Sequence, residues 1–190
     1  MLLEDGYADL LIRKQMPAWK RVLNVQAPYR WNLRRLKPGR MLEVGCGIGR
    51  NLAHVPDSVG VDPNEACVQV AQRRGLSAFT PDTLKEPPES FDSLLVAHVL
   101  EHLTVEQVDD LFATYLPYLK PGGRVILMTP QELGYTTDDT HIWFIDFAAM
   151  AGIVEKQGLT MERTFSFPFP RWAGRLFTYN EFIAVARKPG

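Results

Sequence analysis

The chain is poor in cysteine and lacks internal repeats, low-complexity segments and long apolar runs. Its two cysteines, Cys46 and Cys67, have neither the number nor the spacing of a disulfide framework or a zinc site, so we expect a cytoplasmic protein. No apolar run approaches the roughly 20 residues that a membrane helix needs, and no charged-then-apolar signal segment opens the chain. We therefore expect no association with a membrane.

Net charge is also small, at −1 for 190 residues, but it is unevenly distributed. Between Arg13 and Arg40 every charged side chain is Lys or Arg, which is typical of a solvated helical face or of a surface for a phosphate-rich partner. Nucleic-acid-binding domains are usually basic overall, so a nucleic-acid partner is not expected. We predict a single domain, 1–190, in which N-terminal helices over 1–37 form a lid or a homodimer contact and 38–190 form the core.

Short apolar runs alternate with helical patterns from residue 41 onwards. Strands are predicted at Met41–Val44, Val59–Val61, 77–80, 93–97 and 124–128. Helices are predicted between them: a short one after the first strand, one over 65–74, and one that opens on the capping-box pair Thr104 and Gln107. This alternation predicts a Rossmann-like, doubly wound α/β sheet.

The C-terminal part breaks the alternation. A predicted helix over 147–157 is followed by two strand-like runs, Thr160–Phe167 and 181–186, with only an irregular aromatic stretch between them. Strands joined without a crossover helix are antiparallel. The prediction is therefore a mostly parallel seven-stranded sheet whose last strand pair is antiparallel.

A glycine-rich loop follows the first strand, in MLEVGCGIGRNL. Gly45, Gly47 and Gly49 form a G-x-G-x-G pattern with Cys46 as a small spacer, and such a loop offers backbone N–H groups to a nucleotide. The dinucleotide pattern G-x-G-x-x-G would need a glycine where Arg50 stands, and the phosphate-loop pattern is missing. The loop alone predicts a nucleotide-like ligand without identifying it.

Two acidic residues beside the loop narrow the choice of ligand. Asp62 ends the second strand, where a carboxylate can accept hydrogen bonds from both hydroxyls of a ribose, in NAD enzymes and methyltransferases alike. Glu43 stands two positions before the first glycine, where it would be awkward beside a pyrophosphate. A carboxylate there suits a cofactor with a cationic end, because it can hold an ammonium-bearing ligand.

The segments MLEVGCGIGR, VGVDP, FDSLLVAHVLEHL and LKPGGRVILMTP, in this order and spacing, resemble the class I methyltransferases that use S-adenosylmethionine. The resemblance covers roughly 38–187 and implies that cofactor, with a NAD-type dehydrogenase as the alternative. By position it implies that the loop and Glu43 hold the methionine part, Asp62 the ribose and Asp82 the adenine, although TPDTL departs from the usual glycine–aspartate. It also implies that His98 lies near the sulfonium, and we interpret His102 as scaffolding of the same pocket.

His141 is the candidate general base. It lies in DDTHIWF beyond the fifth strand, where loops at the carboxyl edge of such a sheet face the substrate. An imidazole can accept a hydroxyl proton at neutral pH, which suits a general base. The alternative is that the Thr–His pair serves packing rather than catalysis. Asp138 or Asp139 would orient the ring or hold a divalent ion, since carboxylate oxygens suit Mg²⁺. Trp143 is a candidate substrate contact.

The aromatic stretch SFPFPRWAGRLFTYNEF falls where a substrate lid would be. Arg171 and Trp172 offer hydrogen-bond donors and an apolar face, which suit a sugar ring. Together with TPQELGYTTDDTHIWFIDF, the stretch is similar to the methyltransferases that cap methylmannose polysaccharide at the 1-hydroxyl. That resemblance implies O-methylation of a sugar or oligosaccharide and is compatible with dependence on Mg²⁺. The alternatives are methylation of a small molecule or quinone and methylation of RNA. The sequence argues against RNA, because AHVL stands at the fourth strand's end, where base methyltransferases have an N-P-P-Y-type tetrapeptide.

Overall fold

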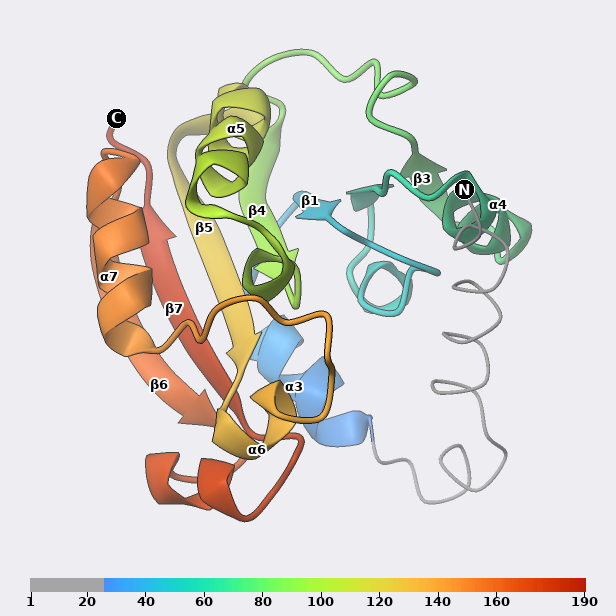
Figure 1. Ribbon diagram of the computed structural model, residues 1–190. Coiled ribbons are helices and arrows are strands. Elements are labelled where there is room, and N and C mark those ends of the chain that lie inside the picture. The colour runs from blue at the N-terminus through green and yellow to red at the C-terminus, as the bar shows by residue number, and fades with distance from the viewer. Residues whose placement is uncertain (1–25) are drawn as a thin grey trace. The chain divides into compact units, whose positions relative to one another are not determined.

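The computed structural model describes residues 26–190, and the helices predicted before residue 26 lie outside the described residues. Seven strands form one mixed sheet in the order β3-β2-β1-β4-β5-β7-β6, which confirms the predicted α/β architecture (Figure 1). The chain divides into two compact units, the first ending at Lys85 and the second spanning Glu86–Gly190. The single domain 1–190 stays a prediction.

The first unit carries the parallel strands that precede and follow the glycine loop. Its described elements are α3 (Ala27–Arg35), β1 (Met41–Val44), η1 (Leu52–His54), β2 (Val59–Val61), α4 (Glu65–Arg73) and β3 (Ser77–Phe79). Strand β2 pairs in parallel with both β1 and β3, and every residue of β1 and β2 is buried, as expected for parallel strands covered on both faces. Helix α4 begins where the Asn64 side chain accepts a hydrogen bond from the backbone N–H of Cys67.

The second unit contains the other four strands. Its elements are β4 (Phe91–Ala97), η2 (Leu100–His102), α5 (Val105–Tyr115), η3 (Leu116–Tyr118), β5 (Leu119–Pro130), α6 (Glu132–Tyr135), α7 (Phe147–Lys156), β6 (Thr160–Phe167), η4 (Arg171–Arg175) and β7 (Glu181–Arg187). Strand β4 is parallel to β5, whereas β7 is antiparallel to both β5 and β6. The antiparallel pair follows from the missing crossover helix, as the sequence predicted.

Several details differ from the sequence predictions, and one of them is that strand β4 begins at Phe91 rather than 93. Strand β5 begins at Leu119 rather than 124, because Leu119 already pairs with Phe91 before an irregularity, and regular pairing resumes at Arg124. Two short helices, α6 and η4, occupy segments for which no helix was predicted. Each is about one turn long, too short to show a helical period in the sequence.

Helices α5 and α7 cover one face of the strands in the second unit (Figure 1). Their buried faces include Phe112 on α5 and Met150 and Ile153 on α7. At the carboxyl ends of β4 and β5 the chain turns into η2 and α6, which carry the polar residues considered below. Among the described helices, none combines the length and the apolar character needed to traverse a bilayer.

Candidate active site

The glycine loop is tied to β2 by backbone hydrogen bonds and by one carboxylate. The N–H of Gly45 donates to the carbonyl oxygen of Val61 over 2.8 Å, and the N–H of Gly47 donates to Asp62 Oδ2 over 2.7 Å. Gly45, Gly47 and Gly49 have φ values of 74°, 52° and 78°, in the left-handed region that glycine adopts without strain. The glycine pattern therefore reflects backbone shape as well as access for a ligand.

Close packing against neighbouring residues fixes the position of the glycine loop. A Cβ added at Gly60 on β2 would lie 2.6 Å from the Sγ of Cys46, and one added at Gly49 would collide with the side chain of Leu76. Cys46 is buried, and burial raises the pKa of its thiol far above the usual range, so the thiol stays protonated. Its packing against β2 suits a small spacer rather than a nucleophile.

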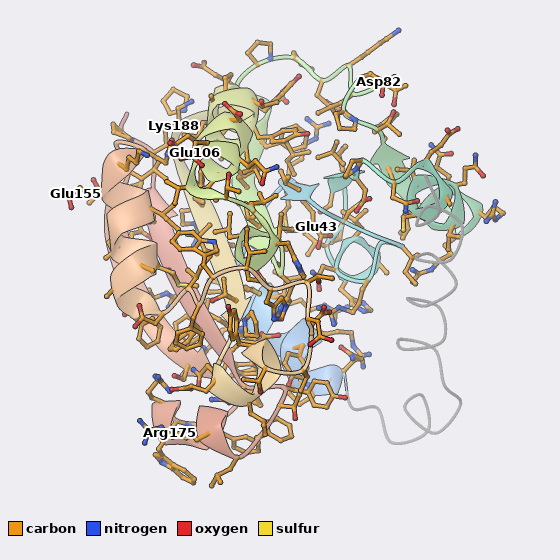
Figure 2. All side chains as sticks on the ribbon, viewed as in Figure 1. Glu43, Asp82, Glu106, Glu155, Arg175 and Lys188 are labelled. Atoms are coloured by element: carbon orange, nitrogen blue, oxygen red, sulfur yellow. The ribbon has the colours of Figure 1, made fainter. Side chains whose placement is uncertain are left out.

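Glu43 is a buried carboxylate with one free oxygen. Its Oε1 accepts a hydrogen bond from Asn51 Nδ2 over 2.6 Å, whereas its buried Oε2 has no hydrogen-bond partner among residues 26–190. Burial raises the pKa of Glu43 to about 7, against the opposing effect of the Asn51 hydrogen bond (Figure 2 labels the residue). A buried oxygen without a donor is costly, and the ammonium group of S-adenosylmethionine would supply the missing donor. The residue therefore fits the ligand that the sequence predicts.

Asp62 is held by two backbone N–H groups. Oδ2 accepts from Gly47, and Oδ1 accepts from Asn64 over 2.9 Å. Burial raises the pKa of Asp62, and these two hydrogen bonds oppose the rise. Each oxygen keeps a second lone pair, so the carboxylate can still accept the two hydroxyls of a ribose. Asp82, predicted near the adenine, is exposed in the turn after β3, where the Thr80 hydroxyl lowers its pKa (Figure 2).

His98 follows β4 with a φ of 57°, and its ring lies between two carboxylates. Its Nε2 is 2.9 Å from Glu181 Oε1, and its Nδ1 is 3.4 Å from Glu101 Oε1. Burial by itself lowers the pKa of His98, but the two carboxylates outweigh it and raise the pKa to about 9. The imidazole is therefore a cation at neutral pH, and its predicted position near the sulfonium stays a prediction.

His141, the predicted base, lies beside a second histidine and a buried acid. The carbonyl oxygen of Tyr135 is 2.7 Å from His141 Nδ1, and the Tyr135 ring stacks on the imidazole at 5.2 Å. The ring of His102 is 4.7 Å from that of His141, and ligand atoms of Glu101, His102 and His141 all lie within 4.8 Å of one another. Because a carbonyl only accepts, Nδ1 of His141 carries the proton, and its Nε2 has a free lone pair.

The two aspartates predicted to support His141 have other positions. Asp138 Oδ1 accepts hydrogen bonds from the hydroxyl of Thr140 over 2.6 Å and from its backbone N–H over 3.1 Å. The Thr140 hydroxyl in turn lies 3.0 Å from His102 Nδ1. Asp138 therefore orients His102 through Thr140. The hydrogen bond from Thr140 is also the main cause that lowers the pKa of Asp138. Asp139 is exposed and is not among the clustered ligand atoms.

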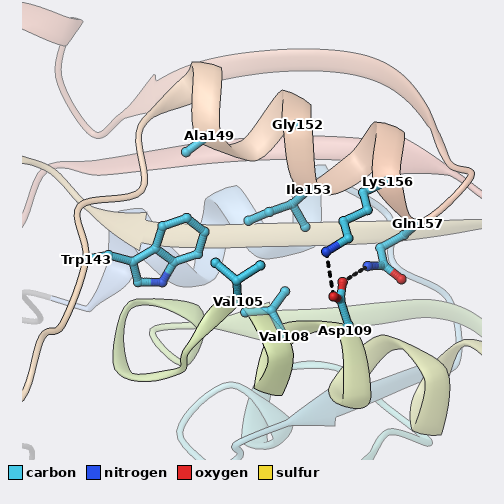
Figure 3. A pocket seen from close by; sticks show the side chains of 9 residues that line it. All are labelled: Val105, Val108, Asp109, Trp143, Ala149, Gly152, Ile153, Lys156 and Gln157. Atoms are coloured by element: carbon cyan, nitrogen blue, oxygen red, sulfur yellow. Dashed lines mark hydrogen bonds and ion pairs between the residues drawn. The ribbon is translucent and has the colours of Figure 1, made fainter.

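Trp143 borders a cavity of about 210 Å³ between α5 and α7 (Figure 3). Its indole N–H donates to the carbonyl oxygen of Leu100 over 2.9 Å, and the ring points towards Val105 and Val108. The lining is apolar except at one end, where Lys156 and Gln157 both bond Asp109. Trp143 thus lines a pocket on the helical face, and its predicted contact with substrate stays a prediction.

Arg171 and Trp172 lie at the start of η4. Arg171 Nη1 donates to Glu132 Oε2 over 2.8 Å, and its guanidinium covers the ring of Phe182 at 4.6 Å. Nη1 and Nη2 of Arg171 thus each donate to Glu132, and the side chain is still 41% exposed. Trp172 is 67% exposed, and Phe169, Leu176 and Tyr179 of the same segment are also exposed. The predicted substrate contacts of Arg171 and Trp172 stay predictions.

Sequence reasoning missed Glu101 and Glu181 as members of the site. Glu101 is fully buried, and neither carboxylate oxygen has a hydrogen bond among the described residues. The signal was present in HVLEH, where an acid and a histidine follow a buried strand directly. Glu181 begins β7, more than eighty residues from His98, and only the strand order brings the two together.

Comparison with known proteins agrees with this geometry. Residues 12–164 match the family described as methyltransferase domain. The mitochondrial ubiquinone biosynthesis O-methyltransferase of Rattus norvegicus is 27% identical over 161 residues, which cover 65% of this chain and 45% of that protein. The ubiquinone biosynthesis O-methyltransferase of Agrobacterium fabrum is 34% identical over 108 residues, which cover 50% and 42%. The chain thus matches less than half the length of these relatives.

Solved structures agree on the fold. A methyltransferase dependent on S-adenosylmethionine from Archaeoglobus fulgidus superposes with a TM-score of 0.70 at 19% identity, covering 96% of this chain and 100% of that one. Magnesium protoporphyrin IX methyltransferase from Synechocystis PCC 6803, with bound S-adenosylhomocysteine, gives 0.67 at 17% identity and covers 98% and 96%. The glycine loop, the sheet order and the family match lead to one conclusion: the chain belongs to the class I methyltransferases that use S-adenosylmethionine.

Proposed function

We propose that this methyltransferase transfers a methyl group to a hydroxyl oxygen of a small aromatic molecule. The observation that carries the proposal is the position of His141, whose free Nε2 lies beside the half-buried ring of Tyr135. Phe144 meets Tyr135 edge-on at 5.3 Å. These two nearly perpendicular rings give an apolar corner against which an aromatic acceptor can pack, with a proton acceptor beside it.

The chemistry is an in-line displacement. The bond between the methyl carbon and sulfur breaks, its electron pair stays on sulfur, and a bond forms between the methyl carbon and the acceptor oxygen. The hydroxyl proton goes to the Nε2 of His141, which the Tyr135 carbonyl keeps in the tautomer with a free lone pair there. Glu43 and Asp62 would hold the ammonium and the ribose of S-adenosylmethionine, which supplies the methyl group.

The relatives favour a small aromatic acceptor over a carbohydrate. The matching curated proteins from rat and Agrobacterium fabrum are named for O-methylation in ubiquinone biosynthesis, and neither is named for a methylmannose polysaccharide acceptor. Arg171, which the sequence suggested for a sugar, is engaged by Glu132. The aspartates suggested for Mg²⁺ do not supply a cluster of ligand atoms, so Mg²⁺ at Asp138 or Asp139 loses its support.

A panel of acceptors tests the proposal. The full chain is incubated with S-adenosylmethionine labelled in the methyl group and with a catechol, a methylated mannoside or RNA. We expect label in the catechol, at a rate that His141→Ala lowers at least 100-fold. His54→Ala, at a half-buried histidine on η1, serves as the matched histidine control and should keep full activity. Label in the mannoside alone would restore the carbohydrate acceptor and overturn this one.

A further inference from the structure

The three side chains beside the proposed acceptor position have the composition of a transition-metal site. Glu101, His102 and His141 offer one carboxylate and two imidazoles, with ligand atoms within 4.8 Å of one another. Glu101 comes from η2, directly after β4, and His141 comes from the loop between α6 and α7. The backbone N–H of Ile142 donates to the carbonyl oxygen of Glu101 over 2.8 Å, which fixes the two segments together.

In both imidazoles Nε2 is the nitrogen available to a metal ion. The Nδ1 of His141 faces the carbonyl oxygen of Tyr135 at 2.7 Å, so it must carry a hydrogen. The Thr140 hydroxyl donates to Asp138, so it can only accept from the Nδ1 of His102, which also faces the Thr140 carbonyl oxygen at 3.2 Å. Both histidines are therefore held in the tautomer that leaves Nε2 unprotonated. Metal-binding histidines are typically oriented by this kind of hydrogen bond from the other ring nitrogen.

Glu101 points independently to a bound cation. It is 0% exposed, and neither of its oxygens has a hydrogen-bond partner among the described residues. His98 forms an ion pair with Oε1 at 3.4 Å and shares its charge with Glu181, whereas Oε2 has no hydrogen-bond partner among the described residues. A buried carboxylate oxygen without a donor or a cation is costly. A divalent ion would compensate Oε2.

We propose that Glu101, His102 and His141 bind one divalent transition-metal ion, with Zn²⁺ or Co²⁺ favoured over Mg²⁺ because two of the ligands are imidazoles. An ion with bonds of about 2.1 Å spaces its tetrahedral ligands about 3.4 Å apart, so the ligand atoms, now within 4.8 Å of one another, need to close by up to about 1.4 Å. Three protein ligands leave a position open for the acceptor.

The role of the ion rests on the proposed function, whereas its binding does not. Glu101, His102 and His141 would hold the ion, which would supply Lewis-acid activation by lowering the pKa of an acceptor hydroxyl. The single free lone pair on Nε2 of His141 cannot serve both purposes, so His141 is the proton acceptor in the metal-free chain and a ligand in the metal-loaded one.

Metal titration of the metal-free full chain tests the site without any substrate. Co²⁺ is added while its visible absorption is recorded, and Zn²⁺ affinity is measured by competition. We expect one equivalent to bind, with the intense bands of a four-coordinate Co²⁺. Glu101→Gln, His102→Ala and His141→Ala should each weaken binding at least 10-fold, whereas His54→Ala should leave it unchanged. Circular dichroism verifies that each variant is folded.

Each alternative result has a defined meaning. Absence of stoichiometric Co²⁺ binding, or binding that the three substitutions leave intact, would overturn the site. Binding that survives His141→Ala while catechol methylation is lost would make His141 a base and not a ligand, which also overturns the three-residue site. Tight, cluster-dependent binding without methylation of any phenol would support the metal site and reject the proposed function.

Discussion

The imidazole of His141 donates its Nδ1 hydrogen to the backbone carbonyl of Tyr135 over 2.7 Å and stacks on the ring of the same residue. One residue of α6 thus sets both the tautomer and the plane of the proposed catalytic ring. The backbone part of this contact survives substitution at Tyr135, and the stacking part does not. The two contributions can therefore be separated by mutation.

We expect Tyr135→Phe to keep kcat within about twofold, because it retains the ring and the carbonyl. Tyr135→Leu removes the stacked ring and should lower kcat for the catechol by about 10-fold, since catalytic groups lose rate steeply when they are poorly oriented. Steady-state kinetics on the two variants measures the effect. Equal rates for the Phe and Leu variants would mean that stacking does not orient His141.

Stability should depend on the ionisation of Glu43. Its pKa is about 7 in the folded chain against 4.5 in the unfolded one, so the folded state binds the proton more tightly. The free energy of unfolding is then unaffected below pH 4.5 and falls as pH rises from about 4.5 to 7, by up to about 3 kcal/mol. Urea unfolding of Glu43→Gln without ligand should show a gain of that order at pH 8.5 and little at pH 4.5. A gain that does not depend on pH would contradict the assignment.

Binding of S-adenosylhomocysteine should release protons near neutral pH. The ligand's ammonium group pairs best with an ionised Glu43, whereas the carboxyl is about half protonated at pH 7 in the free chain. Calorimetric titration at pH 6.5 in buffers of different ionisation enthalpy measures this release. Glu43→Gln should abolish it, so an unchanged buffer dependence in that variant would assign the released proton to another group.

Two glycines with the same φ separate backbone strain from packing. Gly49 and Gly75 both have φ of +78°, but a Cβ at Gly75 meets nothing within 4 Å, whereas one at Gly49 collides with Leu76. Gly75→Ala should lower the free energy of unfolding by about 1 kcal/mol, the cost of left-handed backbone. Gly49→Ala should cost about 1–3 kcal/mol more because the loop must shift. Chemical denaturation measures the stability of both variants. Equal losses of unfolding free energy would contradict the packing argument.

The sheet could be predicted because each strand has a local signature. The buried run in β4 and the missing crossover between β6 and β7 are both visible in the sequence, and the strand order confirms what they imply. The short helices α6 and η4 and the early start of β5 could not be predicted. Their boundaries depend on partners far along the chain, such as Phe91 opposite Leu119.

The candidate site was predictable only where its residues are adjacent in sequence. Glu43, the glycines and Asp62 belong to one strand–loop–strand unit, so spacing alone indicated their association. The environment of His141 depends on η2, which lies some forty residues earlier. Spacing therefore identified His141, Asp138 and Asp139 as candidates, but it did not indicate Glu101, whose ligand atom lies close to those of His102 and His141.

The central claim is that the first unit binds S-adenosylmethionine through Glu43 and Asp62. Isothermal titration of S-adenosylhomocysteine into the wild-type chain, Asp62→Asn and the exposed control Asp57→Asn tests it most directly. We predict tight binding by the wild type and by Asp57→Asn, and at least 10-fold weaker binding by Asp62→Asn, because each hydrogen bond to a charged group contributes about 1.5–3 kcal/mol. Equal affinity of all three chains, or binding of NAD in place of S-adenosylhomocysteine, would contradict the claim.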